Sequence, residues 1–144
     1  MTAAELHDRY VAEIDKRGID DKYIDGVEER ELMQIAIQHG FPPERARAVV
    51  VDVCREKGYV IEASLVQFIR EQLKLKAKSD GSLDRAAYEA VIREASGRLA
   101  LTTRSPREVM QLVESTMDDS GYRRARPWWQ PDWLRRLTNR GGIN

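Results

Sequence analysis

The stretch "IDGVEERELMQIAIQHGFPP", Ile24 to Pro43, contains the start of a helix, its buried stripe and its end. Asp25 and Glu28 have the spacing of a capping box, in which each side chain accepts a hydrogen bond from the backbone N–H of the other. Gly40 followed by Phe41 is typical of a Schellman stop. The residues expected to share one face between these signals are Leu32, Ile35, Ala36 and His39. The stretch therefore predicts one α-helix.

Five further segments carry start or stop signals of the same kind, and each predicts another helix. They cover about residues 2–18, 42–58, 62–76, 82–97 and 105–120. Capping boxes begin the first at Thr2 and the last at Ser105, and Pro42 or Pro43 begins the second. Ser82 is the expected N-cap of the helix over 82–97.

Two segments affect the number of helices. Residues 49–53, VVVDV, would also suit a β-strand, but the flanking ERARA and CREK are strong helix formers and Gly58 supplies a stop. Pro131 can begin a short seventh helix. We therefore predict an all-α fold, a single compact bundle of six to seven short helices with degenerate EF-hand-like corners. The predicted domain covers residues 1–120, followed by a distinct segment, 121–144.

Composition narrows the class of protein. The chain has 144 residues, enough for one domain with a core of its own. Cys54 is the only cysteine, so no internal disulfide is possible. The N-terminus is charged throughout and lacks the apolar core of a signal peptide, and no apolar run reaches the roughly 18 residues of a membrane span. We expect a cytoplasmic protein that does not use a membrane.

The C-terminal segment is the main asymmetry of the sequence. Residues 121–144 hold six arginines, one aspartate and all three tryptophans, whereas the first 120 residues carry a balance of −5. A buried tryptophan removes roughly 200 Å² from water, worth about 5 kcal/mol before ordering costs, so these rings should pack against protein. Their own domain is the first expectation and a partner protein the second. The expected partner-binding residues are Arg123, Arg124, Arg126, Trp128, Trp129, Trp133, Arg135 and Arg136.

Nucleic-acid binding is the alternative role for this segment. Arginine would contact phosphates and tryptophan would stack on unpaired bases, with Lys74, Lys76 and Lys78 extending the surface. The acidic remainder of the chain would repel a polyanion, so protein binding is preferred. The oligomeric state is left open.

Three helix starts share a glycine followed by an aliphatic residue and an acid, as in the second half of an EF-hand loop. In the loop over residues 76–87, lysines stand where carboxylates are needed, so we expect no calcium there. The loop over residues 20–31 has acids at both ends, but Lys22 and Ile24 occupy intermediate ligand positions. Its candidate metal ligands are Asp20, Asp25, Glu28 and Glu31, and their simpler role is at the positive end of a helix.

These corners, over about residues 18–97, resemble the tellurite-resistance B-like (TerB-like) helical domains. The resemblance implies an all-α interaction or sensing module with an acidic surface cluster. The matching acids are Asp20, Asp21, Asp25, Glu28, Glu29 and Glu31. The arginine- and tryptophan-rich segment is a departure from that family, and a divalent-metal sensor is the function that the resemblance adds as an alternative.

Signals for enzyme chemistry are missing. His7 and His39 lie on different expected helices and belong to no recognisable metal-ligand spacing. Cys54 lies beside the valine stripe and should behave as a small apolar residue. No glycine-rich phosphate loop, nucleophile elbow or dinucleotide motif is present. The sequence thus predicts a non-enzymatic adaptor or sensing module without a cofactor, whose partner is another protein.

Overall fold

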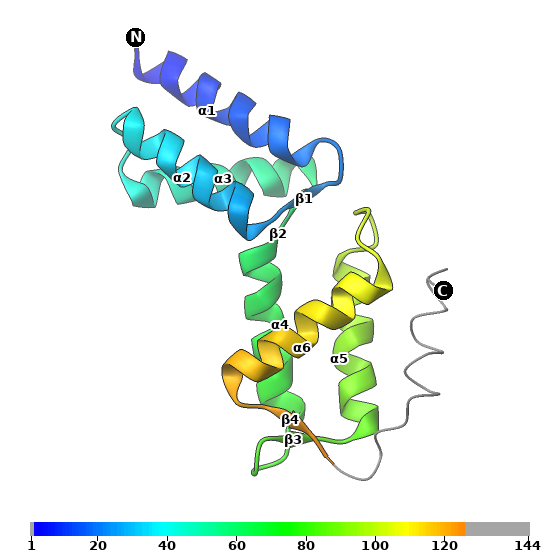
Figure 1. The fold of residues 1–144 in the computed structure, drawn as a ribbon. Coiled ribbons are helices and arrows are strands. Elements are labelled where there is room, and N and C mark those ends of the chain that lie inside the picture. The colour runs from blue at the N-terminus through cyan, green and yellow to red at the C-terminus, as the bar shows by residue number, and fades with distance from the viewer. Residues whose placement is uncertain (1, 126–144) are drawn as a thin grey trace. The chain divides into compact units, whose positions relative to one another are not determined.

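The computed structural model describes residues 2–125, and these form six α-helices joined by short loops (Figure 1). The helices are α1 (Ala3–Gly18), α2 (Gly26–Gln38), α3 (Pro43–Lys57), α4 (Glu62–Lys76), α5 (Arg85–Arg98) and α6 (Pro106–Ser120). Four two-residue strands accompany them: β1 (Tyr23–Ile24), β2 (Val60–Ile61), β3 (Ser82–Leu83) and β4 (Arg123–Arg124). The all-α prediction and its six helices are confirmed. The short helix expected from Pro131 lies outside the described residues.

The helix starts follow the capping chemistry read from the sequence. Thr2, Asp25 and Ser105 each accept a hydrogen bond from a backbone N–H three residues later, at 3.1, 2.8 and 3.2 Å. At the end of α2, the Phe41 N–H donates to the carbonyl of Ala36 at 2.8 Å, which is the Schellman bond. The VVVDV run lies inside α3, so its helical assignment is also confirmed.

The start of α5 differs from the prediction. Its N-cap is Asp84, whose carboxylate accepts from the Ala87 N–H at 2.9 Å. Ser82 is buried in β3, where its N–H and its hydroxyl both donate to Asp80. Ser82 was wrong as the cap because Leu83 is drawn into the core on an extended backbone, which delays the helix by two residues. Strands of two residues are too short to show an alternating pattern in a sequence.

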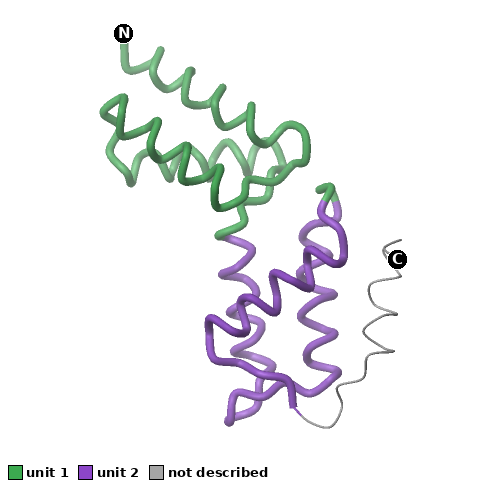
Figure 2. The backbone as a smooth tube through the Cα atoms, in the orientation of Figure 1, with its two compact units in different colours: residues 1–63, 101–103 green, residues 64–100, 104–144 purple. Residues whose placement is uncertain are grey.

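The helices gather into two compact units, drawn in different colours in Figure 2. Unit 1 comprises residues 1–63 and 101–103, and unit 2 comprises residues 64–100 and 104–144. The division falls between Ala63 and Ser64, inside the first turn of α4. A helix continues through it, so no linker composition in the sequence announces it.

Unit 1 has a continuous apolar core formed by α1, α2, α3 and both of its strands. Its buried members are Tyr10, Ile14, Ile24, Leu32, Ala36, Phe41, Ala46, Val49, Val50, Val53, Cys54, Tyr59 and Ile61. The Tyr10 hydroxyl donates to the carbonyl of Leu32 at 3.0 Å and so joins α1 to α2. Strands β1 and β2 run parallel, with Tyr23 opposite Val60 and Ile24 opposite Ile61.

Unit 2 is built on the apolar faces of α4, α5 and α6. Its largest fully buried side chains are Ile69, Leu73, Leu83, Tyr88, Val91 and Val113. The Arg98 guanidinium lies 3.7 Å from the centre of the Phe68 ring, a cation–π contact between α5 and α4. Strands β3 and β4 also run parallel, with Ser82 opposite Arg123 and Leu83 opposite Arg124.

The two units repeat one order of elements: helix, strand, two helices, strand. Their loops agree in detail. Asp21 accepts from the N–H two residues later at 3.1 Å, and Asp80 does the same at 2.9 Å. The next residue has positive φ in both loops, 60° at Lys22 and 85° at Gly81. Lys22 holds there a conformation that glycine adopts at little cost.

Candidate functional site

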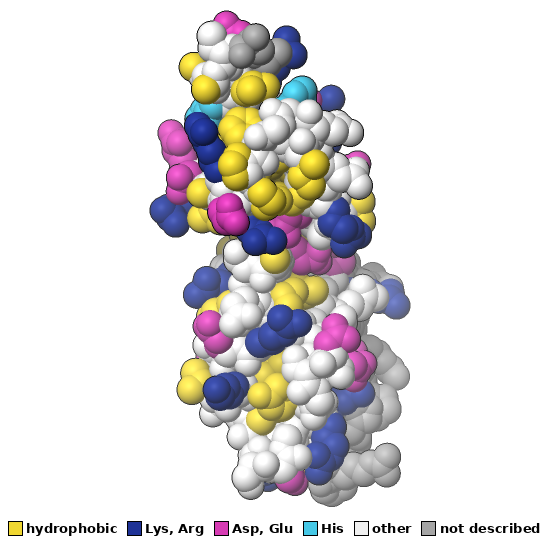
Figure 3. All heavy atoms as spheres, turned by 90° about the vertical axis from the view of Figure 1, so that its left-hand side faces the viewer, with side chains coloured by type: hydrophobic (Ala, Val, Ile, Leu, Met, Phe, Trp, Pro, Cys, Tyr) yellow, Lys and Arg dark blue, Asp and Glu magenta, His cyan; other side chains and the backbone are white. Residues whose placement is uncertain are grey.

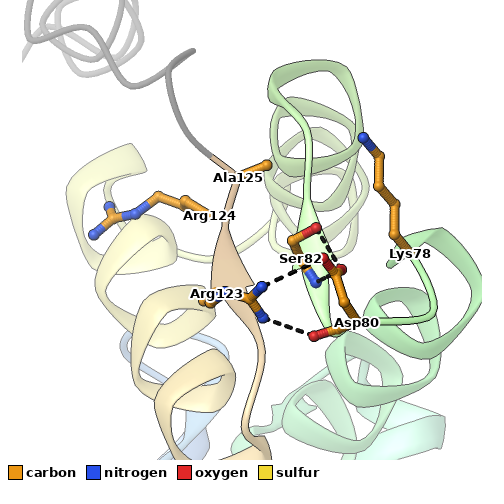
Figure 4. Close-up of a pocket in the computed structure, with 6 residues that line it drawn as sticks. All are labelled: Lys78, Asp80, Ser82, Arg123, Arg124 and Ala125. Carbon is orange, nitrogen blue, oxygen red and sulfur yellow. Dashed lines mark hydrogen bonds and ion pairs between the residues drawn. The ribbon is translucent and has the colours of Figure 1, made fainter.

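An open cleft of about 460 Å³ lies beside β3 and β4 in unit 2 (Figure 4). Its described lining consists of Lys78, Asp80, Ser82, Arg123, Arg124 and Ala125. A smaller cleft of about 190 Å³ lies beside β4 and α6. It is lined by Glu114, Met117, Asp118, Tyr122, Arg123 and Arg124. The arginines of β4 line both clefts, and they are the first two residues of the sequence-predicted site.

Arg123 is held by the loop that precedes β3. One guanidinium nitrogen donates to the backbone carbonyl of Asp80 at 2.7 Å, and the other lies 3.3 Å from its carboxylate (Figure 4). The hydrogen bonds that Asp80 accepts from Ser82 lower the pKa of that carboxyl, and the charge of Arg123 lowers it further. Asp80 is therefore a carboxylate at neutral pH and a fixed counter-ion for Arg123.

Arg124 is held from the other side, by α6. Its guanidinium donates to the same Glu114 oxygen that accepts a hydrogen bond from the Tyr88 hydroxyl at 3.1 Å. Burial raises the pKa of the Tyr88 phenol, and the nearby Glu114 carboxylate raises it further. Tyr88 therefore stays a neutral donor, and Arg124 and Glu114 form an ion pair at the surface of the core.

The other sequence-predicted partner-binding residues lie outside the described residues. They are Arg126, Trp128, Trp129, Trp133, Arg135 and Arg136. Among the described ones, Arg123 and Arg124 face carboxylates of their own unit. Lys78 is exposed at the rim of the larger cleft.

The acidic corner of unit 1 is organised around helix α2. Asp25 and Glu28 form the capping box, and the Glu31 carboxylate lies 3.6 Å from Arg17. Glu62 accepts from the Gly26 N–H at 2.8 Å, a contact across 36 residues that sequence reasoning missed. Asp20 is exposed. Among residues 2–125, no three His, Cys, Asp or Glu side chains gather in a way that could hold a metal ion.

Cys54 and the two histidines lie in positions that indicate structural roles. Cys54 is buried in the unit 1 core, and burial raises the pKa of its thiol to about 11, with Glu29 contributing. A thiol with such a pKa is a poor nucleophile at neutral pH. His39 is the C-cap residue of α2, where the sequence placed it, and His7 is 3.9 Å from Asp8 on α1.

A polar cluster at the end of α1 was not anticipated. The Tyr59 hydroxyl donates to the Asp15 carboxylate, which also lies 3.1 Å from the ammonium of Lys57. The hydrogen bond from Tyr59 lowers the pKa of Asp15, and Lys57 lowers it further. A methyl group added at Gly18 would lie 2.4 Å from the Tyr59 ring, so the ring packs directly on that glycine. A glycine at a helix end and a tyrosine 41 residues later carry no signal of this contact in a single sequence.

The two units differ in charge by as much as residues 1–120 differ from the C-terminal segment. Unit 1 holds nine Lys and Arg against fourteen Asp and Glu, a balance of −5. Unit 2, with the C-terminal segment, holds fifteen against ten, a balance of +5. Outside residues 121–144, unit 2 holds nine Lys and Arg against nine Asp and Glu, so its positive balance comes from the C-terminal segment.

No helix among the described residues is long and apolar enough to cross a membrane. Comparisons of the chain with protein-family models, curated proteins and solved structures gave no match. The similarity to TerB-like domains stays a prediction, and the functional argument depends on the residues themselves.

Proposed function

We propose that this chain is a non-enzymatic helical module that recognises another protein through its arginine- and tryptophan-rich segment, residues 121–144. The single cysteine suits a reducing compartment, so the proposed place of action is the cytoplasm. The module acts as an adaptor: its helices present the segment, and the partner supplies the surface that shelters the indole rings.

The observation that carries the proposal is the fixed position of β4. Arg123 and Arg124 are tied to Asp80 and Glu114, and the Ala125 N–H donates to the carbonyl of Leu83 at 2.8 Å. The segment therefore starts from a defined point beside an open cleft. A binding segment that is held at one end when the partner first meets it loses less entropy in that encounter than a free peptide does.

The composition of the segment favours a protein partner. Tryptophan and arginine are the residue types most enriched at the energetic centres of protein interfaces. Burying three indole rings against a partner would remove a large apolar area from water, which favours binding.

Several polar groups of the described residues have structural roles that fit a non-enzymatic module. Asp25, Asp84 and Ser105 begin helices. Asp80 and Glu114 balance arginines. Cys54, with its raised pKa, is not poised as a nucleophile.

The test uses the full chain and a variant in which Trp128, Trp129 and Trp133 are alanine, each as bait for proteins of the source cell. Partners retained by the native chain and lost by the variant are expected, and each is then purified and titrated. The matched control is Leu75→Ala, which removes an exposed apolar side chain elsewhere. Identical partners with all three baits would refute the proposal.

Nucleic-acid binding is a second candidate, and the positive charge of residues 121–144 supports it. The +5 balance of unit 2 with its C-terminal segment would attract a polyanion. In the view of Figure 3, basic, acidic and apolar side chains are interspersed on the described surface of each unit. Titration with single-stranded and duplex oligonucleotides at two salt concentrations decides it. Affinity that falls steeply with salt favours this candidate, and millimolar or weaker binding excludes it.

A further inference from the structure

Strands β2 and β4 occupy equivalent places in the two units. Each follows a left-handed glycine at the end of a helix, Gly58 after α3 and Gly121 after α6. Their first N–H groups make equivalent bonds: Val60 donates to the carbonyl of Lys22 at 2.9 Å, and Arg123 to that of Gly81 at 3.0 Å. The backbone geometry is the same, so the difference between them lies in the side chains.

Strand β2 is fixed by apolar burial. Tyr59, just before it, is 8% exposed, and Ile61 within it is 7% exposed and belongs to the unit 1 core. The residue that follows, Glu62, adds its bond to the N-terminus of α2. Opening β2 would expose a tyrosine and an isoleucine to water, a cost that salt does not reduce.

Strand β4 is fixed by charge. Arg123 and Asp80 have side chains that are 61% and 59% exposed, and Arg124 and Glu114 are 35% and 36% exposed. Both pairs are accessible to salt and to competing carboxylates, and pairs of this exposure contribute modestly to stability. Opening β4 breaks these bridges and a two-residue strand pairing, and Tyr122, which precedes β4 as Tyr59 precedes β2, is half-buried and does not belong to the buried core.

We propose that β4 is a releasable strap: carboxylates of an acidic partner displace Asp80 and Glu114 from Arg123 and Arg124, and β4 separates from β3. The proposal rests on the proposed function, since it gives that partner its chemistry, an acidic protein surface. Release makes the guanidinium groups of Arg123 and Arg124 available to the carboxylates of the partner.

The first experiment measures amide hydrogen exchange of the full chain at low salt and in about 1 M sodium chloride, where the Debye length is about 3 Å. Exchange at Arg123 and Ala125 is expected to rise about fivefold, as two partly exposed ion pairs weaken. Exchange at Val60, the equivalent amide of β2, is expected to change by less than about twofold. Equal changes at the two strands, or no change at β4, would overturn the proposal.

A second experiment replaces the partner with a defined probe. Poly-L-glutamate is added at low salt, with sodium glutamate at the same carboxylate concentration and ionic strength as the control. The polymer is expected to accelerate exchange at Arg123 and Ala125 several-fold, and the monomer to do so much less, because only the polymer offers neighbouring carboxylates to both arginines. Equal effects of polymer and monomer would contradict displacement by a partner.

Variants separate the strap from general loss of structure. Asp80→Asn with Glu114→Gln keeps side chains of the same size and should give the high-salt exchange rate already at low salt. Asp52→Asn, which breaks an exposed pair with Arg55 on α3, is the matched control and should change nothing in β4. Arg123→Val with Arg124→Ile installs the residues of β2, and the salt response of β4 should disappear. A salt response that persists in this swap would overturn the proposal.

These outcomes are independent of the bait experiment. A chain that loses its partners with the tryptophan variant but shows no salt-dependent opening of β4 retains the proposed function and loses the strap. If β4 opens with salt but the bait experiment captures no partner, the opening of the strand is supported and the proposed function is rejected.

Discussion

The loop into β1 and the loop into β3 follow the same backbone course, but different forces close them. In unit 1 the closing strand carries Ile61 into the core, and in unit 2 the equivalent residue is Arg124, paired with Glu114. The comparison teaches that the aspartate turn, the positive φ and the parallel pairing specify the shape of the corner. The side chains of the second strand decide how much free energy is needed to open it.

The largest effect is expected when the buried isoleucine of β2 in unit 1 is replaced by the arginine that β4 has in unit 2. Ile61→Arg places a charge at a residue that is 7% exposed, and the α3 position that corresponds to Glu114, seven residues before the glycine that ends the helix, is Val51. We expect the free energy of unfolding to fall by about 3 kcal/mol or more. Urea unfolding followed by far-ultraviolet circular dichroism measures it.

The reciprocal variant, Arg124→Ile, is the control for that prediction. It removes one partly exposed ion pair and should cost about 1 kcal/mol or less. Equal losses for the two variants would mean that the equivalent positions are not held by different forces.

A second prediction concerns the packing of Tyr59 on Gly18. Gly18→Ala forces a methyl group against the body of the ring, not its flexible end, and should destabilise the protein by about 1–3 kcal/mol. Gly97→Ala, in α5, meets nothing within 4 Å and should stabilise by up to about 1 kcal/mol, since alanine is the better helix former. Thermal unfolding of both variants tests the contrast, and a neutral Gly18→Ala would contradict the packing argument.

A smaller effect is expected at Glu62, which supplies a carboxylate to the N-terminus of α2 where unit 2 has Ala125. Glu62→Ala should cost about 1 kcal/mol, and Glu62→Gln about half as much because the amide oxygen still accepts a hydrogen bond. The difference between the two variants, read from urea midpoints, isolates the charge. Identical losses would show that the charge contributes nothing.

The smallest expected effect is a pH dependence in the loop before β3. The pKa of Asp80 is lowered in the folded state by Ser82 and Arg123, so its contribution is present above the ordinary carboxyl pKa. That contribution is lost as the pH falls through the lowered value. Exchange at Ser82 and Arg123, corrected for intrinsic rates, should accelerate below about pH 4 in the native chain. Asp80→Asn should remove that acceleration, and an unchanged acid response in the variant would assign it to another group.

Local signals in the sequence were enough to locate the helices. Capping boxes, prolines and stop glycines act within a few residues, and the bonds at Thr2, Asp25 and Ser105 are formed as expected. Ser82 failed because the burial of Leu83, a tertiary effect, outweighed the local preference for a cap. The division into two units could not be seen, since it falls inside a helix with ordinary composition.

The candidate site was predictable only in its residue types. Arg123 and Arg124 stood out as part of a basic segment, but their counter-ions lie 43 and 10 residues away. The bond from Gly26 to Glu62 and the contact of Tyr59 with Gly18 likewise join residues distant in sequence. Such pairs form only because the loops bring distant residues together. The two units share this loop geometry, but the sequence of either loop alone gives only a weak signal of it.

Because Cys54 is buried, the reactivity of its thiol can be used to measure the opening of unit 1. It is the only thiol, it is 2% exposed and it lies in the core of unit 1, so a thiol-reactive dye can label the chain only when that unit opens. The three indoles all belong to the C-terminal segment, so fluorescence excited selectively at tryptophan follows that segment alone. Two optical signals can therefore be recorded on the unmodified chain, one for each end of the molecule.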